Sequence, residues 1–153
     1  MTELNLLERL KKIASKFNEK GVKYVLVGGL ALWLHGIRRY TEDIDFVFVG
    51  DEDQLELLKK ALFELYDDPQ IQELTPSDIR YSVIRYGAPD GTVIDIIFRI
   101  GEVADFEKLQ PYIETKEIDG VPVKVLSREG LIFLKEGSLR PLDQHDTALL
   151  KKL

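Results

Sequence analysis

Asp43 and Asp45 are the residues whose type and spacing point most directly to chemistry. They stand two positions apart at the start of an apolar segment, Phe46 to Val49, whose composition is typical of a strand. Because residues two apart on a strand face the same side, both carboxylates enter one small volume. Two like charges at that spacing are unfavourable unless one is protonated or a cation lies between them. Carboxylate oxygens suit hard divalent ions, so the pair predicts a Mg²⁺ or Mn²⁺ site.

A glycine pair, Gly28 and Gly29, precedes these aspartates by thirteen intervening residues, Leu30 to Glu42. The pair stands where an apolar strand over 24–27 ends and an apolar helix reaching about Leu34 begins. Glycine lets the backbone approach a phosphate group closely, and the N–H groups at a helix start are phosphate donors. We therefore expect phosphate binding at this turn.

A third carboxylate, Asp95, stands among branched apolar residues in the segment Thr92 to Phe98. An ionised carboxylate in such a strand is costly unless a cation or strong donors meet it. Either the face of the strand that carries Asp95 is open to water, with Arg99 as the partner of Asp95, or Asp95 lies beside Asp43 and Asp45 and forms one cluster with them. Three carboxylates on neighbouring strands suit a two-metal site. Asp95 would then complete the second metal site or accept a proton from an attacking hydroxyl.

The segments around these motifs predict an α+β fold, a mixed sheet flanked by helices. Helical spacing of apolar residues over 6–17 ends at Gly21, and Asp51 and Ser127 are candidate N-caps of later helices. Strands are expected over 44–49, 80–86, 92–99, 112–117 and 121–125, and a last helix after the 137–141 break. The residues 88–91 predict a turn between the second and third of these strands, and Asp119-Gly120 predicts a hairpin turn between the last two. Pro69 and Pro76 predict a loop between them. With no repeat or linker, we expect one domain over residues 1–153.

Composition narrows the function classes. A formal net charge of −6 argues against non-specific coating of nucleic acid, although lysines crowd the N-terminal 23 residues and leave a local basic patch open. The absence of cysteine excludes disulfides, thiolate zinc sites and cysteine nucleophiles. No apolar run is long enough to span a bilayer, so we expect a cytoplasmic protein without a membrane partner. High charge, no cysteine and two asparagines are typical of a thermophile.

Gly28-Gly29, Asp43-Ile44-Asp45 and Asp95 together resemble the motifs of the nucleotidyltransferase superfamily related to DNA polymerase beta. Within it, the segment Arg39 to Phe46 is similar to the pattern of minimal abortive-infection (AbiEii)-type nucleotidyltransferases. The end of the chain also resembles that group, through Lys135, Arg140, Asp143 and Asp146.

This resemblance implies a reaction in which an NTP such as ATP gives its NMP to an acceptor hydroxyl and releases pyrophosphate. Asp43, Asp45 and Asp95 would be the catalytic residues and would hold Mg²⁺ or Mn²⁺, which offsets developing charge. The nucleotide- and phosphate-binding residues it implies are Gly28, Gly29, Arg39, Thr41, Lys135 and Arg140.

Two departures from the family pattern keep an alternative open. Gly29 stands where family members often carry serine, and Leu142 stands where a lysine usually precedes the first C-terminal aspartate. Lys135 can equally be a solvated lysine at a helix end, and Arg140 can pair with Asp143 on the surface. The enzyme interpretation leaves the acceptor open among RNA such as tRNA, protein and small molecules such as antibiotics. The alternative is a catalytically inactive nucleotide- or partner-binding domain, such as one component of a toxin–antitoxin pair.

Overall fold

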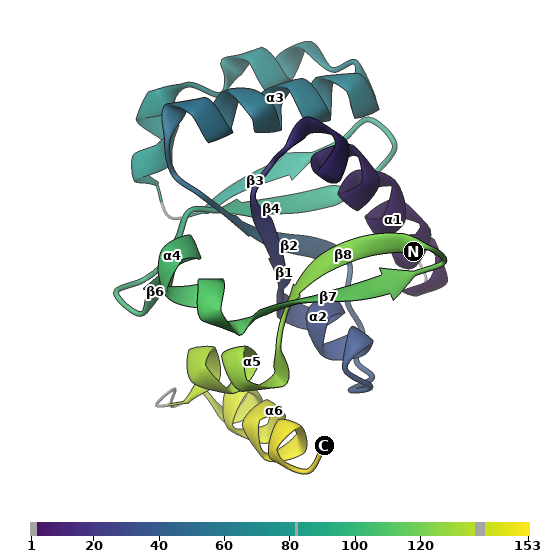
Figure 1. Cartoon of the computed structure of the whole chain (residues 1–153), viewed down its shortest axis with the longest axis vertical. Coiled ribbons are helices and arrows are strands. Elements are labelled where there is room, and N and C mark those ends of the chain that lie inside the picture. The colour runs from purple at the N-terminus through teal and green to yellow at the C-terminus, as the bar shows by residue number, and fades with distance from the viewer. Residues whose placement is uncertain (1–2, 82, 137–139) are drawn as a thin grey trace.

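The computed structural model describes residues 3–81, 83–136 and 140–153. Its centre is a six-stranded mixed sheet with the strand order β3-β4-β2-β1-β8-β7, and a two-stranded sheet, β5-β6, lies beside it (Figure 1). The predicted α+β class is confirmed. The strands are β1 (Tyr24–Val27), β2 (Asp43–Phe48), β3 (Val83–Gly87), β4 (Val93–Ile97), β5 (Arg99–Ile100), β6 (Ala104–Asp105), β7 (Ile113–Ile118) and β8 (Val121–Leu126).

The strand directions bring the motifs of the sequence together. β2 runs antiparallel to β1 and parallel to β4, and β3 is antiparallel to β4 at the edge of the sheet. β1 pairs with β8 in parallel, and β7 and β8 form the predicted hairpin. Its turn residues Asp119 and Gly120 both have positive φ, 50° and 84°, which is the conformation that a two-residue hairpin turn requires.

Three of the helices begin or end at the caps and the glycine that the sequence predicts. They are α1 (Glu3–Lys20), α2 (Gly28–Leu34), α3 (Glu52–Tyr66), α4 (Phe106–Leu109), α5 (Arg128–Lys135) and α6 (Pro141–Lys151). Asp51 accepts a hydrogen bond from the Gln54 N–H at 2.7 Å, and Ser127 accepts one from Gly130 at 3.2 Å. Gly21, with φ of 73°, ends α1 in the left-handed conformation that favours glycine.

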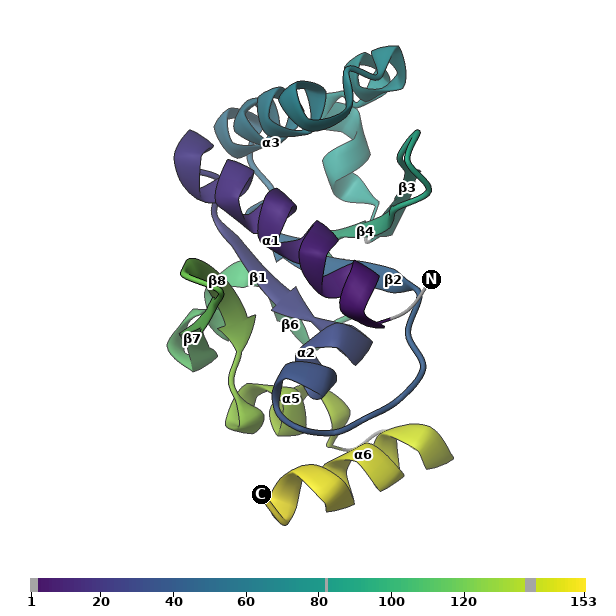
Figure 2. The same ribbon diagram turned by 90° about the vertical axis from the view of Figure 1, so that its right-hand side faces the viewer.

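The core lies between the sheet and the helices that cover it. α1 packs against β8 and against α3, so the two long helices lie together over the sheet (Figures 1 and 2). Phe17 of α1 meets three aromatic rings of β1 and β2, with centroid distances of 5.3 Å to Tyr24, 5.2 Å to Phe46 and 5.5 Å to Phe48. Tilted and edge-on pairs at these distances stabilise beyond their buried area. This cluster anchors β2, the strand that carries Asp43 and Asp45.

Two regions differ from the sequence-based prediction. The expected loop around Pro69 and Pro76 is two short 3₁₀ helices, η1 (Pro69–Glu73) and η2 (Pro76–Arg80). Each begins with its proline, because a residue with fixed φ and no N–H is suited to a first helical position. The β5-β6 hairpin was not predicted, since two-residue strands carry no readable alternation.

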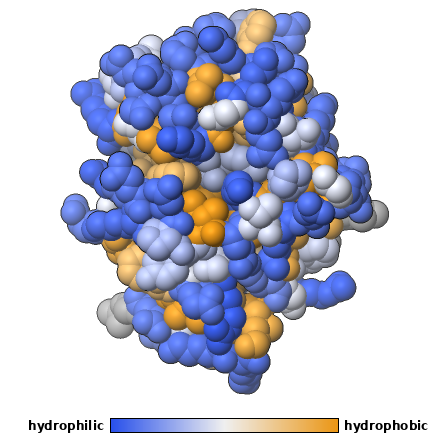
Figure 3. Space-filling model, viewed as in Figure 1, coloured by the Kyte–Doolittle hydropathy of each residue, from blue (hydrophilic) through white to orange (hydrophobic). Residues whose placement is uncertain are grey.

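α5 and α6 lie against each other beyond one end of the sheet, and the loop between α2 and β2 passes near them (Figure 2). The face in Figure 3 is mostly hydrophilic, with apolar side chains in small groups. Within the described ranges, no helix combines the length and the apolarity needed to cross a bilayer.

Candidate active site

The glycine turn lies directly beside the aspartates, because β1 ends where β2 begins. Val27 is the register partner of Asp45, so the next residue, Gly28, meets the Asp45 side chain. Gly28 has a φ of +76°, and a Cβ atom there would lie 2.2 Å from the Asp45 Oδ2. A Cβ on Gly29 would lie 3.0 Å from the Thr41 Oγ1. Thr41 therefore places a hydroxyl in the space beside Gly29 that a serine side chain would take.

The carboxylates converge because β2 and β4 are parallel neighbours in register. Asp45 pairs with Asp95, and Asp43 precedes Asp45 by two residues on the same strand. The Asp43 and Asp95 side chains both accept hydrogen bonds from Arg85 of β3, at 2.8 Å from Nη2 to the Asp43 Oδ2 and 3.0 Å from Nε to the Asp95 Oδ1. The side-chain partner of Asp95 is thus Arg85. Arg99 lies on β5, outside the six-stranded sheet, where its backbone is in register with Asp105 of β6.

The ionised form of Asp45 is disfavoured by its surroundings. Burial, a hydrogen bond with Asp95 and the charges of Asp95 and Asp43 raise the pKa of Asp45 to about 7, while Arg85 lowers it. Its Oδ1 atom is buried and has no hydrogen-bond partner among the described residues. A buried acceptor without a partner is costly, so this oxygen is suited to a cation.

In the metal-free protein, the pKa of Asp45 gives a pH-dependent stability. The unfolded chain ionises Asp45 near 3.8, whereas the folded chain holds the proton to about pH 7. Between these values the folded state binds more protons, so the free energy of unfolding falls as pH rises and levels off above about 7. We expect a loss of roughly 3 kcal/mol between pH 5 and pH 8. Urea unfolding in EDTA at pH 5 and pH 8 measures it.

Asp45→Asn is the matched variant for this measurement, because it keeps the shape and removes the titration. Its unfolding free energy should change less between pH 5 and pH 8 than that of the wild type. An identical change in both proteins would mean that Asp45 titrates normally in the folded state.

The predicted basic residues gather around Asp146 of α6, which is 1% exposed. Its Oδ2 accepts from Arg39 Nη1 at 2.7 Å and lies 3.2 Å from Lys135 Nζ. Lys135 also lies 3.1 Å from Asp143, and Arg140 lies 3.8 Å from the same residue. Asp146 thus ties the loop before β2 to the ends of α5 and α6.

A cleft of about 510 Å³ opens beside the carboxylates. Its lining comes from the glycine turn, the loop before β2, the start of β2 and α6: Gly29, Arg39, Tyr40, Thr41, Glu42, Asp43, Asp45 and Leu142. The predicted residues Gly28, Asp95, Lys135 and Arg140 do not line it. Asp95 is the register partner of Asp45 on β4, Gly28 follows its register partner Val27 on β1, and Lys135 and Arg140 pair with Asp143 of α6.

The fit of a metal ion depends on Arg85. Within residues 3–81, 83–136 and 140–153, no group of three or more acidic or histidine side chains has the arrangement of a metal site. The oxygens of Asp43 and Asp95 are bonded to the Arg85 guanidinium instead. The donors are nevertheless carboxylate oxygens from adjacent strands, with the unpartnered Asp45 Oδ1 among them, and this set suits Mg²⁺ or Mn²⁺.

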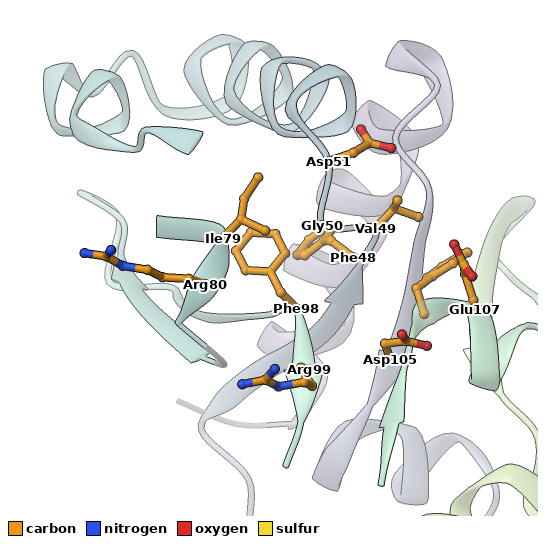
Figure 4. A pocket seen from close by; sticks show the side chains of 11 residues that line it. Phe48, Val49, Gly50, Asp51, Ile79, Arg80, Phe98, Arg99, Asp105 and Glu107 are labelled. Atoms are coloured by element: carbon orange, nitrogen blue, oxygen red, sulfur yellow. The ribbon is translucent and has the colours of Figure 1, made fainter. Parts of the chain in front are cut away.

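A second cavity, of about 330 Å³, lies at the other end of β2 (Figure 4). Arg80 and Arg99 stand on one side of it, and Asp51, Asp105 and Glu107 on the other. Asp51 and Asp105 already accept backbone N–H groups as helix caps. None of the predicted site residues lines this cavity, so the candidate active site is the cleft beside Asp43 and Asp45.

Arg85 is the site residue that sequence reasoning missed. The turn over 88–91 carried the signal, since a hairpin centred near residue 90 places positions 85 and 95 opposite each other. The structure has this register, Arg85↔Asp95. The burial of Asp146 was also not predicted, because a lone aspartate in an amphipathic helix usually faces water.

Comparison with known proteins identifies the fold and the family. Similar solved structures include a candidate nucleotidyltransferase from Thermotoga maritima (20% identity, 99% of this chain and 94% of that chain, TM-score 0.60). They also include ANT(2")-Ia in complex with adenylyl-2"-tobramycin (16% identity, 97% of this chain and 88% of that chain, TM-score 0.58). A third is the lincomycin-bound lincosamide antibiotic adenylyltransferase LnuA (20% identity, 97% of this chain and 94% of that chain, TM-score 0.54).

No curated protein matches the chain in sequence. A family model described as "Nucleotidyl transferase AbiEii toxin, Type IV TA system" matches residues 13–136. This match covers most of the chain and includes the glycine turn and all three aspartates. The prediction of a nucleotidyltransferase is confirmed, and so is the association with toxin–antitoxin systems. The chain belongs to the AbiEii family of nucleotidyl transferase toxins.

Proposed function

We propose that this nucleotidyltransferase moves the NMP of an NTP to an acceptor hydroxyl in a reaction that depends on Mg²⁺ or Mn²⁺ held by Asp43, Asp45 and Asp95. The observation that carries the proposal is the in-register pairing of Asp45 with Asp95 on parallel strands, beside the glycine turn. A divalent ion bound there supplies charge neutralisation for the phosphates.

Side chains of the cleft and of β4 have separate roles in the proposed transfer. The oxygen of the acceptor hydroxyl attacks the α-phosphorus, the bond to the bridging oxygen of the β-phosphate breaks, and pyrophosphate leaves. Asp95 accepts the hydroxyl proton. Arg39, which lines the cleft, meets the triphosphate, and Thr41 offers the hydroxyl that Gly29 lacks. The close approach of Thr41 to Gly29 supports this substitution of one hydroxyl for another.

Lys135 and Arg140 lie outside the lining of the cleft, and we propose different roles for them. Lys135 and Arg39 both contact Asp146, so Lys135 acts on the nucleotide through Arg39 and not by direct contact. Arg140, at the start of α6, is three-quarters exposed and lies near the cleft residue Leu142 in sequence. We propose that it meets the outer phosphates.

The test of the proposed function is calorimetric titration of ATP, GTP, CTP and UTP, with and without Mg²⁺. We expect Mg²⁺-dependent binding of at least one NTP, and its loss in Asp43→Asn/Asp45→Asn. The matched control is Glu52→Gln/Asp53→Asn, which removes the same charge from the exposed first turn of α3. Absence of binding at millimolar NTP would contradict the proposal.

The acceptor is identified in a second step with an NTP labelled at the α-phosphate. The open cleft admits a hydroxyl from RNA, from a protein or from a small molecule. Label recovered in one of these three fractions, and only with Mg²⁺ or Mn²⁺ present, names the acceptor class. We further propose that the chain acts as the toxin of a toxin–antitoxin pair, so that its antitoxin is a physiological partner.

A further inference from the structure

Arg85 is the cation that holds the carboxylates Asp43 and Asp95 of the candidate active site. It stands on the edge strand β3 directly opposite Asp95. Its guanidinium makes three hydrogen bonds to the carboxylates, with Nε at 3.0 Å from the Asp95 Oδ1 and Nη2 at 2.8 Å from the Asp43 Oδ2 and 3.3 Å from the Asp95 Oδ2. One side chain of β3 thus contacts a carboxylate on its neighbour β4 and a second carboxylate on β2, the strand beyond β4.

The bridge neutralises the site only in part. The site brings three carboxylates, those of Asp43, Asp45 and Asp95, together with the single guanidinium of Arg85. Arg85 bonds to the two outer carboxylates, and the Asp45 Oδ1 keeps no hydrogen-bond partner among the described residues. A divalent ion carries twice the charge of Arg85 and needs oxygens that Arg85 already holds. Arg85 and a metal ion therefore cannot use Asp43 and Asp95 in the same way at once.

Arg85 is also free to leave the carboxylates. Its side chain is 65% exposed, whereas those of Asp43 and Asp95 are 30% and 14% exposed. β3 is the outermost strand at its side of the sheet (Figure 2), and no strand of the described ranges pairs with its outer edge. An arginine on a flexible stem at a sheet edge changes rotamer without movement of the backbone.

We infer that Arg85 is a built-in competitor of the metal ion. In the metal-free protein its guanidinium holds Asp43 and Asp95, and a divalent ion binds only after displacing it. The apparent affinity for a bare metal ion equals the intrinsic affinity multiplied by the fraction of molecules in which Arg85 has left the carboxylates. A metal ion that arrives with an NTP has an advantage, because the triphosphate takes up the displaced guanidinium. The site thereby loads the metal together with the nucleotide. This inference rests on the proposed function and adds the order in which its ligands bind.

The experiment is titration of Mn²⁺ into the full chain without nucleotide, with free Mn²⁺ followed by electron paramagnetic resonance. We expect Arg85→Ala to bind bare Mn²⁺ at least tenfold more tightly than the wild type. Arg85→Lys keeps the charge but cannot bridge two carboxylates with a planar fork, so its affinity should lie between the two. The control Arg99→Ala removes the same charge from β5 and should match the wild type.

The same titration with an excess of the NTP that the wild type binds completes the test. The nucleotide should tighten Mn²⁺ binding strongly in the wild type and less in Arg85→Ala, because only the wild type has a guanidinium to release. The inference would be overturned if Arg85→Lys bound Mn²⁺ with the affinity of the wild type and Arg99→Ala bound it as tightly as Arg85→Ala. The effect would then depend only on the net charge of the protein.

Failures of the inference and of the proposed function have different signatures. Equal Mn²⁺ affinity of the wild type and Arg85→Ala, with binding abolished by Asp43→Asn/Asp45→Asn, overturns the competition and leaves the proposed metal site intact. No Mn²⁺ binding by any variant, with or without NTP, overturns both.

Discussion

Gly28→Ala is expected to destabilise the protein by about 3 kcal/mol and to lower nucleotidyl transfer at least about a hundredfold. Gly28 has a φ of +76°, and a Cβ would stand 2.2 Å from the Asp45 Oδ2 and 3.1 Å from the Asp45 Cβ. No real Cβ contact is that short, so the Asp45 carboxylate must leave the position that it holds in the site. Urea unfolding and the rate of NTP consumption measure the two effects.

Gly36→Ala separates backbone strain from this contact. Gly36 also has a positive φ, +93°, but a Cβ there would meet nothing within 4 Å. Its substitution should cost only about 1 kcal/mol and leave transfer unchanged. If Gly28→Ala does not fold, the double variant Gly28→Ala/Asp45→Ala should regain stability, because it removes the oxygen that the new Cβ strikes. Equal stability of Gly28→Ala and Gly36→Ala would contradict the predicted contact.

Asp146→Ala is expected to lower the free energy of unfolding by about 3 kcal/mol and to weaken NTP binding about tenfold. Asp146 is buried between Arg39 and Lys135, whose side chains are only 20% and 17% exposed. Removing the anion leaves two poorly hydrated cations facing each other. Arg39 then loses the bond that orients it in the cleft, so the loss of binding outweighs the gain of a net positive charge. Urea unfolding and calorimetry measure both quantities.

Asp143→Ala is the matched control, because it removes the same charge one turn earlier on α6. It keeps the bonds of Asp146 to Arg39 and Lys135 and should cost about 1 kcal/mol with little effect on NTP affinity. Asp146→Asn, which keeps one acceptor oxygen, should fall between the wild type and Asp146→Ala. NTP affinity unchanged in Asp146→Ala would show that Arg39 is positioned without α6.

The fold was predictable wherever a local pattern carries its own physical cause. Asp51 and Ser127 cap the helices that follow them, and Asp119-Gly120 forms the hairpin turn. The β5-β6 hairpin and the 3₁₀ helices were missed, because elements of two to five residues are too short for a period to be read. Strand order and direction were not predictable in detail either, since they depend on contacts between distant segments.

The candidate site shows the same limit. Asp43 and Asp45 follow from a spacing of two on one strand, and Asp95 from its apolar surroundings. The partners of these residues did not follow, because each partner is brought in by the packing of another element. Arg85 arrives through the register of β3 with β4, and Asp146 through the packing of α6 on α5. The roles of the nine predicted residues stay a prediction, which the variants of Asp43, Asp45 and Gly28 test directly.

The bond between Arg39 and Asp146 joins residues 107 positions apart in the chain. During synthesis, the glycine turn and Asp43 are made first, Asp95 follows, and Asp146 is made only near the end of the described sequence. A growing chain that stops before Pro141 has every residue of the sheet but no anchor for Arg39. Copies of the chain that end before Asp146 would therefore carry the acidic half of the cleft without its ordered basic half.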